Sequence, residues 1–112
     1  MPTKSSARIC ELNDRLCKDP YGGHGRVMMT ASVNALGTAF VIRMLAAVAA
    51  FDDFPKGDDP YREHDFGAVD VDGTKVYFKI DYYDLELRYG SEDPSDPAQT
   101  ARVMTLMLPE DY

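Results

Sequence analysis

The sequence is poor in the residue patterns that usually mark a catalytic or metal-binding protein. Its 112 residues include two cysteines and two histidines, and they form no H-E-x-x-H or C-x-x-C arrangement and no recognisable motif around a nucleophile. Cys10 and Cys17 lie on one predicted helix, where their spacing separates the two Cα atoms by about 10 Å along the axis. We therefore expect no disulfide between them, no zinc site built on the pair and no cofactor.

Long apolar segments are also missing. The longest, residues 35–51, is short for a membrane-spanning helix and carries Arg43 near its centre. The first six residues are polar and no apolar run follows them, so a signal peptide is not expected. These features predict a cytoplasmic protein that does not associate with a membrane. The length suits one domain, residues 1–112.

Basic residues are scarce in the second half of the chain. Residues 1–50 carry six basic and three acidic side chains, whereas residues 51–112 carry six basic and sixteen acidic ones, which gives net charges of +3 and −10. Direct binding to nucleic acid is not expected, because Lys and Arg dominate contacts with phosphates. The acidic half instead favours a protein partner with a basic surface, or a cation. The alternative is that this acidity only keeps the protein in solution.

The most specific local pattern is a β-hairpin within residues 59–84. Asp72-Gly73 is the pair preferred in a two-residue type I′ turn, and alternating apolar residues flank it on both sides. This turn predicts the cross-strand pairs Asp70–Lys75, Ala68–Tyr77, Phe66–Lys79 and His64–Asp81. The apolar face that should meet the helices consists of Val69, Val71, Val76, Phe78 and Ile80.

The opposite face and the open end of the hairpin form the candidate binding site. It combines aromatic and charged side chains, which are typical of recognition surfaces. Its predicted residues are His64, Asp65, Phe66, Tyr77, Lys79, Asp81, Tyr83 and Asp84. The alternative is that a helix or loop covers part of this face and that its aromatic residues are ordinary core residues.

The predicted pair of His64 and Asp81 leaves three interpretations open. A carboxylate fixes the tautomer of a histidine and raises its pKa, which suits a general base or a metal ligand. Neighbouring carboxylates could complete a cation site. The third interpretation is a structural pair that ties the base of the hairpin together.

The remaining patterns predict three helices and further strands. An amphipathic helix is expected from about Ser6 to Lys18, a strand at residues 26–30, and a helix at residues 36–51 that is packed on most of its circumference. Residues 85–89 predict a third strand, or an extension of the second beyond a bulge near Asp84. Asp96-Pro97 and Gln99 then predict a helix start, with Pro109 ending that helix. The fold class is α+β, a small antiparallel sheet of three to four strands with about three helices on one face.

Several longer motifs resemble an uncharacterised family of small bacterial proteins that are often encoded on plasmids and prophages of alphaproteobacteria. The motifs are R-I-x-x-L-N-D-x-L (residues 8–16), D-P-Y-x-E-H-D-F-G (residues 59–67) and K-I-D-Y-Y-D (residues 79–84). The resemblance implies no activity, cofactor or catalytic residue. It implies a setting, because mobile elements carry many small acidic proteins that disable host defences.

The sequence thus favours a non-enzymatic interaction protein. The leading hypothesis is an inhibitor of the anti-CRISPR or anti-restriction type, whose acidic half occupies a basic nucleic-acid-binding surface on a host defence protein. One alternative is a small metal- or nucleotide-dependent enzyme centred on His64 and Asp81. Another is a homodimer formed through the free hairpin face or a sheet edge.

Overall fold

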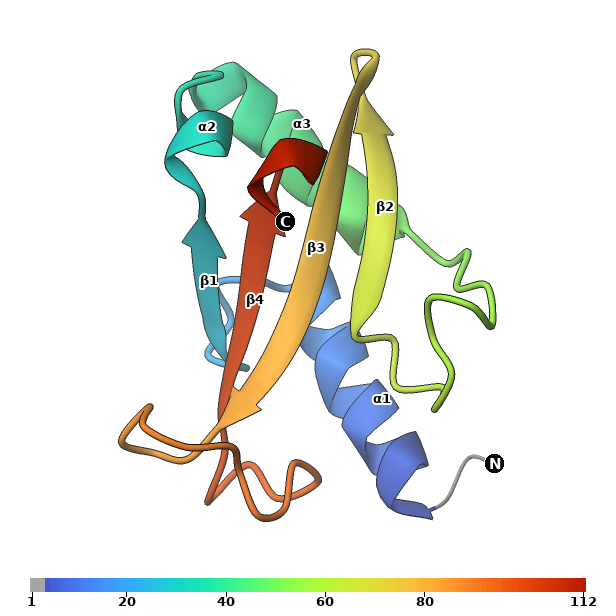
Figure 1. Ribbon diagram of the computed structural model, residues 1–112, viewed down its shortest axis with the longest axis vertical. Helices are drawn as coiled ribbons and strands as arrows, with labels where there is room; N and C mark the ends of the chain where they lie inside the picture. Colours follow the sequence, from blue (N-terminus) through green and yellow to red (C-terminus); the bar gives the residue numbers. More distant parts are fainter. Residues whose placement is uncertain (1–3) are drawn as a thin grey trace.

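The computed structural model describes residues 4–112 and shows a four-stranded mixed sheet with its long helices on one face (Figure 1). The elements are α1 (Lys4–Lys18), β1 (Arg26–Met29), α2 (Ala31–Asn34), α3 (Thr38–Ala50), β2 (Phe66–Val71), β3 (Thr74–Tyr83), β4 (Ala101–Met107) and a final 3₁₀ turn, η1 (Pro109–Asp111). The strand order is β1-β4-β3-β2. The predicted α+β class is confirmed.

The β2–β3 hairpin has the predicted turn and register. Asp72 and Gly73 have φ values of 54° and 82°, as a type I′ turn requires. The Asp70 side chain accepts a hydrogen bond from the backbone N–H of Gly73. Phe66 pairs with Lys79 at the other end of β2, so the predicted register is confirmed over the whole strand.

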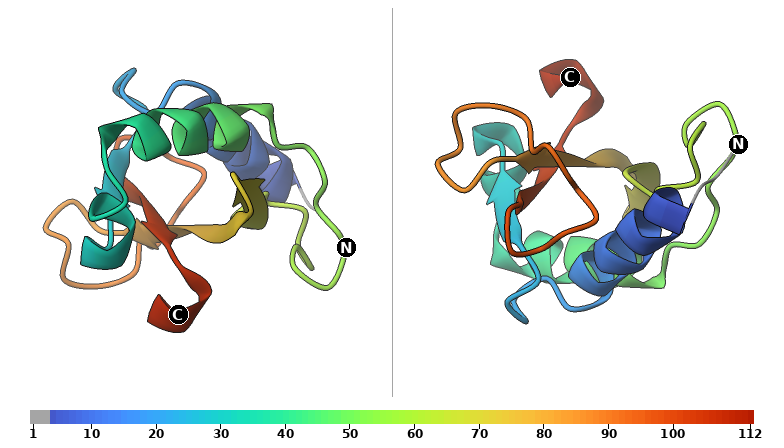
Figure 2. Two further views of the ribbon diagram at one scale, coloured as in Figure 1. Left: turned by 90° about the horizontal axis from the view of Figure 1, so that it is seen from above. Right: turned by 90° about the horizontal axis from the view of Figure 1, so that it is seen from below.

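The core lies between the sheet and the two long helices, which Figure 2 shows together on one side while η1 lies on the other. We call the helix side of the β2–β3 hairpin the covered face and the other side the open face. The buried core residues include Leu16 from α1; Phe40, Met44 and Val48 from α3; Val69, Val71, Val76, Phe78 and Ile80 from the hairpin; and Met104 and Leu106 from β4.

Helix α3 is less enclosed than the sequence predicts. It buries one stripe, while Ile42 is exposed and Arg43 forms an ion pair with Asp72 at the hairpin turn. The expectation of packing on most of its circumference was wrong, because six of the thirteen positions of α3 are exposed. Among the helices of residues 4–112, none has the length and apolar character that crossing a membrane requires.

The predicted C-terminal helix is wrong, because β4 occupies most of that segment. The residues that were predicted to start this helix do form a turn. The Asp96 side chain accepts hydrogen bonds from the Ala98 backbone N–H and from the Gln99 side chain. The helix is not continued, because the following residues pair with β3 on one side and with β1 on the other. A central strand buried on both faces lacks simple alternation, and its apolar spacing can imitate a helix.

Two further expectations about the sheet need correction. The β1–β4 pair is parallel, so the sheet is mixed and not wholly antiparallel. Residues 85–89 form no strand: the chain reverses after Asp84, whose backbone N–H donates to Tyr89 O, and Leu87 adopts a positive φ of 61°. In place of the predicted strand extension, the structure has one isolated antiparallel β-bridge, between Tyr83 and Gly90.

A buried polar network joins α1 to the sheet. The Asn13 side chain donates to Tyr82 Oη (2.8 Å) and to Glu63 O (2.9 Å), and its Oδ1 accepts from Arg102 Nε (2.7 Å). Arg102 also donates to Pro94 O, and burial lowers the pKa of its guanidinium. Because Glu63 and Pro94 belong to the two long loops, this network fixes both loops against the sheet.

Candidate functional site

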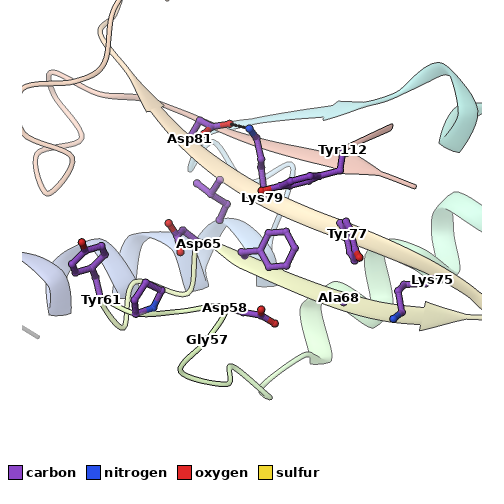
Figure 3. Close-up of a pocket in the computed structure, with 13 residues that line it drawn as sticks. Gly57, Asp58, Tyr61, Asp65, Ala68, Lys75, Tyr77, Lys79, Asp81 and Tyr112 are labelled. Carbon is purple, nitrogen blue, oxygen red and sulfur yellow. Dashed lines mark ion pairs between the residues drawn. The ribbon is translucent and has the colours of Figure 1, made fainter. Parts of the chain in front are cut away.

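The open face of the hairpin carries a hollow of about 710 Å³ (Figure 3). Its aromatic part is a cluster of three rings, in which the Phe66 centroid lies 5.2 Å from that of Tyr77 and 6.1 Å from that of Tyr112. Tyr112 follows η1, so the C-terminal turn covers part of this face. Partial cover is what the alternative sequence interpretation expects, but Phe66 and Tyr77 stay partly exposed and so are not ordinary core residues.

Charged side chains surround these rings. Lys79 Nζ lies 3.2 Å from Asp81 Oδ2 on β3, and Asp58 and Lys75 also line the hollow. Burial, together with the nearby charge of Glu63, raises the pKa of Asp65 to about 6. The hollow therefore offers both charge signs beside an aromatic platform.

Five of the eight predicted binding residues line this hollow: Asp65, Phe66, Tyr77, Lys79 and Asp81. Tyr83 lies further along β3, at its last position. Asp84 lines a second hollow with Tyr89 and Glu92 in the loop that follows. Sequence reasoning missed Tyr112, whose approach depends on the position of η1.

His64 is the residue that the prediction placed wrongly. The hairpin hydrogen bonds continue to Asp65, whose O accepts from Ile80 N, but His64 then adopts φ 58° and turns away from the ladder. Its ring stacks on Phe54 on the covered face at 3.8 Å between centroids. Its Nδ1 lies 2.7 Å from Asp14 Oδ1, while Asp81 pairs with Lys79. The predicted pair of His64 and Asp81 is therefore not formed, and an enzyme centred on it has no geometric support.

Asp59 holds this unusual backbone in place. Its Oδ1 accepts hydrogen bonds from the backbone N–H groups of Glu63 (2.9 Å) and His64 (3.0 Å). A positive φ is costly for residues with a side chain, and Arg62 also has one at 59°. The buried carboxylate offsets this cost by satisfying two backbone donors of the tight loop.

A second cluster lies beneath the hairpin, where α1 meets this loop. The ligand atoms of Cys10, Asp14 and His64 all lie within 4.8 Å of one another, a group that could hold a metal ion. Cys10 and Asp14 are four residues apart and so share one face of α1. That helical spacing was visible in the sequence, but the contact with His64 depends on a loop that the sequence did not predict.

The two cysteines have different surroundings. Cys17 is buried with its Sγ 3.9 Å from Met104 Sδ, whereas Cys10 is partly exposed and donates to Asp14 Oδ2. Both are free thiols, as predicted. Burial, with the Asp14 charge, raises the pKa of Cys10 to about 12, so this thiol is not an activated nucleophile.

Most of the acidic residues lie in two loops at one end of the sheet. Eleven of the sixteen acidic residues of the second half fall in residues 52–65 and 84–100, with three basic residues among them. The first loop enters β2 and the second leaves β3. Since β2 and β3 are antiparallel, both loops meet the hairpin at the end opposite its turn (Figure 1). We call residues 52–65 and 84–100 the acidic loops.

Comparison with known proteins gives a family but no activity. A family model described as "Protein of unknown function (DUF3768)" matches residues 29–111, which include Asp59 and His64 but not α1. No curated protein and no solved structure matches the chain significantly. Because the model covers well over half of the chain, the protein belongs to this family of unknown function.

Proposed function

We propose that the protein is a non-enzymatic binding module that uses the open face of its hairpin to dock a protein with a basic surface. The observation that carries the proposal is the partly exposed aromatic cluster of Phe66, Tyr77 and Tyr112, which shares its hollow with residues of the acidic loop 52–65. Aromatic rings bury large areas at low entropic cost and often anchor interfaces. Carboxylates around such an anchor favour and orient a cationic partner.

The occupant we propose is a nucleic-acid-binding surface of another protein. Such surfaces present Lys and Arg spaced to neutralise phosphates. Ten of the eleven acidic side chains of the acidic loops are at least partly exposed, and only Asp59 is buried. Occupying that surface would block its nucleic acid. This activity would suit an inhibitor of host defence encoded by a mobile element, which is the role that we propose within this family.

The aromatic part of the proposal can be tested by affinity capture from the native host. Tyr77→Ser removes the central ring of the open face, whereas Ile42→Ser removes an exposed apolar side chain from α3. We expect a basic nucleic-acid-binding protein to be retained by the wild type and by Ile42→Ser, and lost with Tyr77→Ser. Equal retention by both variants would place the interface elsewhere.

The electrostatic part of the proposal is tested with its own matched pair of charge-reversal variants. Glu86→Lys reverses a charge in an acidic loop, and Asp19→Lys makes the same charge reversal at an exposed position just after α1, away from the residues that line the open face. Binding of the captured protein should weaken steeply with salt and should suffer more from Glu86→Lys. A salt-independent affinity would contradict the proposal. So would a homodimer, detected by light scattering, that Tyr77→Ser dissociates.

A further inference from the structure

The residues under the hairpin, on the side away from the open face, point to a metal. We propose that Cys10, Asp14 and His64 bind one zinc ion. Asp59 positions the imidazole of His64 from its other side. The site is distinct from the aromatic cluster of the open face, because it lies between α1 and the loop 52–65 on the covered side.

The first argument is the arrangement of the donor atoms. Cys10 Sγ lies 3.8 Å from Asp14 Oδ2, and His64 Nδ1 lies 2.7 Å from Asp14 Oδ1. The candidate donor atoms of all three residues lie within 4.8 Å of one another. Donor atoms around a tetrahedral zinc ion are separated by about 3–4 Å, given bond lengths of about 2.0–2.3 Å. Small side-chain rotations would therefore bring the three donors around one ion.

The second argument is an unsatisfied buried carboxylate beside this group. The Asp59 side chain is 1% exposed, and its Oδ2 has no hydrogen-bond partner among the described residues. His64 Nε2 lies 3.8 Å from this oxygen, beyond hydrogen-bond distance. Buried carboxylate oxygens are normally hydrogen-bonded, so an oxygen left in this state calls for an explanation.

Metal binding through His64 Nδ1 provides that explanation. A histidine that ligates a metal through one ring nitrogen usually donates its other N–H to a carboxylate, which fixes the tautomer and the ring orientation. With Nδ1 on the ion, Nε2 carries the proton and faces Asp59 Oδ2. Stacking on Phe54 and the hydrogen bond from the His64 backbone to Asp59 hold the ring in this orientation.

The donor set selects zinc over the hard cations. Sulfur and imidazole nitrogen suit Zn²⁺, whereas Mg²⁺ and Ca²⁺ require oxygen ligands. A doubly charged ion also outweighs the one thiolate charge created on binding, so it reduces the net negative charge of Asp14 and the buried Asp59, which share one imidazole in the metal-free protein. On binding, the Cys10 thiol loses its proton to solvent and coordinates as the thiolate. Asp14 and His64 are 36% and 29% exposed, so solvent can reach the fourth coordination position.

Cobalt provides a direct probe, because a cobalt–thiolate bond gives a charge-transfer band that oxygen or nitrogen ligands do not produce. We expect chelator-treated full-length protein to bind Co²⁺ with one-to-one stoichiometry, to show this band, and to lose it when Zn²⁺ is added. Mg²⁺ should displace no cobalt. A wild-type protein that shows no thiolate band would overturn the proposal and leave the cluster as a structural contact between α1 and the loop.

The variants use the second cysteine as the matched control. Cys10→Ser should abolish the band, and Cys17→Ala, on the same helix, should keep it. Asp59→Asn retains an oxygen for the backbone contacts but removes the acceptor for Nε2–H. It should keep the band and weaken zinc binding by about 10–100-fold. A band that survives in Cys10→Ser, or zinc affinity unchanged in Asp59→Asn, would contradict the assigned roles.

Discussion

The covered and open faces of the β2–β3 hairpin are built from the same strands but differ in burial and polarity. Along β3, Val76, Phe78 and Ile80 are at most 3% exposed, whereas the residues between them, Tyr77 and Lys79, are partly exposed. The alternation follows from strand geometry, and the Asp72-Gly73 turn decides which set faces the helices. One face thus supplies the packing of the core, while the other stays accessible to solvent.

The two faces differ most at the base of the hairpin, where the alternation ends. There the covered side becomes polar: His64 turns inward, and Asn13 and Arg102 form a buried network next to it. Removing the hydrogen-bond partner of a buried polar group destabilises the fold by more than the intact hydrogen bond stabilises it. This polar region therefore holds α1 and both acidic loops in place.

The largest expected effect is on the free energy of unfolding, and it distinguishes the covered face from the open face. Phe78→Ala would empty a fully buried position in contact with Phe51 and Phe54, and should lower the free energy of unfolding by about 4 kcal/mol. Tyr77→Ala, at the adjacent position on the open face, should cost about 1 kcal/mol. Urea denaturation measures both values. Similar losses from the two substitutions would mean that the open face also belongs to the core.

The next largest effect is expected in the polar region of the covered side. Asn13→Ala would leave Arg102 Nε, Tyr82 Oη and Glu63 O each without one hydrogen-bond partner, and should lower the free energy of unfolding by about 3 kcal/mol. Asn34→Ala, at an exposed position of α2, serves as the control and should change stability by about 0.5 kcal/mol or less. A small effect of Asn13→Ala would show that water replaces the lost contacts.

Overpacking the covered face should have an intermediate effect. A Cβ atom added at Gly67 would lie 2.4 Å from Phe78 Cε1 and 2.7 Å from Phe51 Cε2, so neither ring could keep its place. Gly67→Ala should therefore lower the free energy of unfolding by about 2 kcal/mol. The neighbouring substitution Ala68→Gly, on the open face, is the comparison in the same denaturation experiment. If the alanine at position 67 were tolerated better than Ala68→Gly, the aromatic packing described for the covered face would be wrong.

The sequence predicts those features of the two hairpin faces that depend on residues close together in the chain. Asp72 and Gly73 specify a turn, the turn specifies a register, and the register places five of the eight predicted residues around one hollow. The stripe of Ile9, Leu12 and Leu16 on α1 is also buried as predicted. These features follow from short spacings, so no knowledge of distant segments is needed.

The features that the sequence does not predict depend on distant segments. Asp96 and Gln99 form the turn expected at a helix start, but pairing with β1 and β3 makes residues 101–107 a strand. His64 leaves the hairpin because Asp59 and Asp14 bind its backbone and ring from other elements. Helix-like spacing in a central strand and a positive φ in a loop give no reliable local signal.

The smallest expected effect concerns the C-terminal turn that partly covers the open face. The Asp111 side chain accepts hydrogen bonds from the Ser32 and Thr30 hydroxyls and from Leu108 N, and these bonds lower the pKa of its carboxyl. Because the folded pKa lies below the unfolded one, this stabilisation is fully present above about pH 4 and is lost as the pH falls through the folded pKa.

Asp111→Ala should therefore release η1 at neutral pH, while the wild type should release it only in acid. The expected result is faster amide exchange at Leu108 and Tyr112, with little change in the melting temperature, because the turn lies outside the core. Tyr112 would then leave Phe66 and Tyr77, with which its ring makes edge contacts. Nuclear magnetic resonance would detect this as changed chemical shifts of the Phe66 and Tyr77 ring protons. The chemical shifts of the Phe78 ring, on the covered face, should not change. Unchanged amide exchange in Asp111→Ala would mean that the aromatic contacts alone hold the turn in place. The C-terminal turn would then cover the open face more stably than the exposure of its side chains indicates.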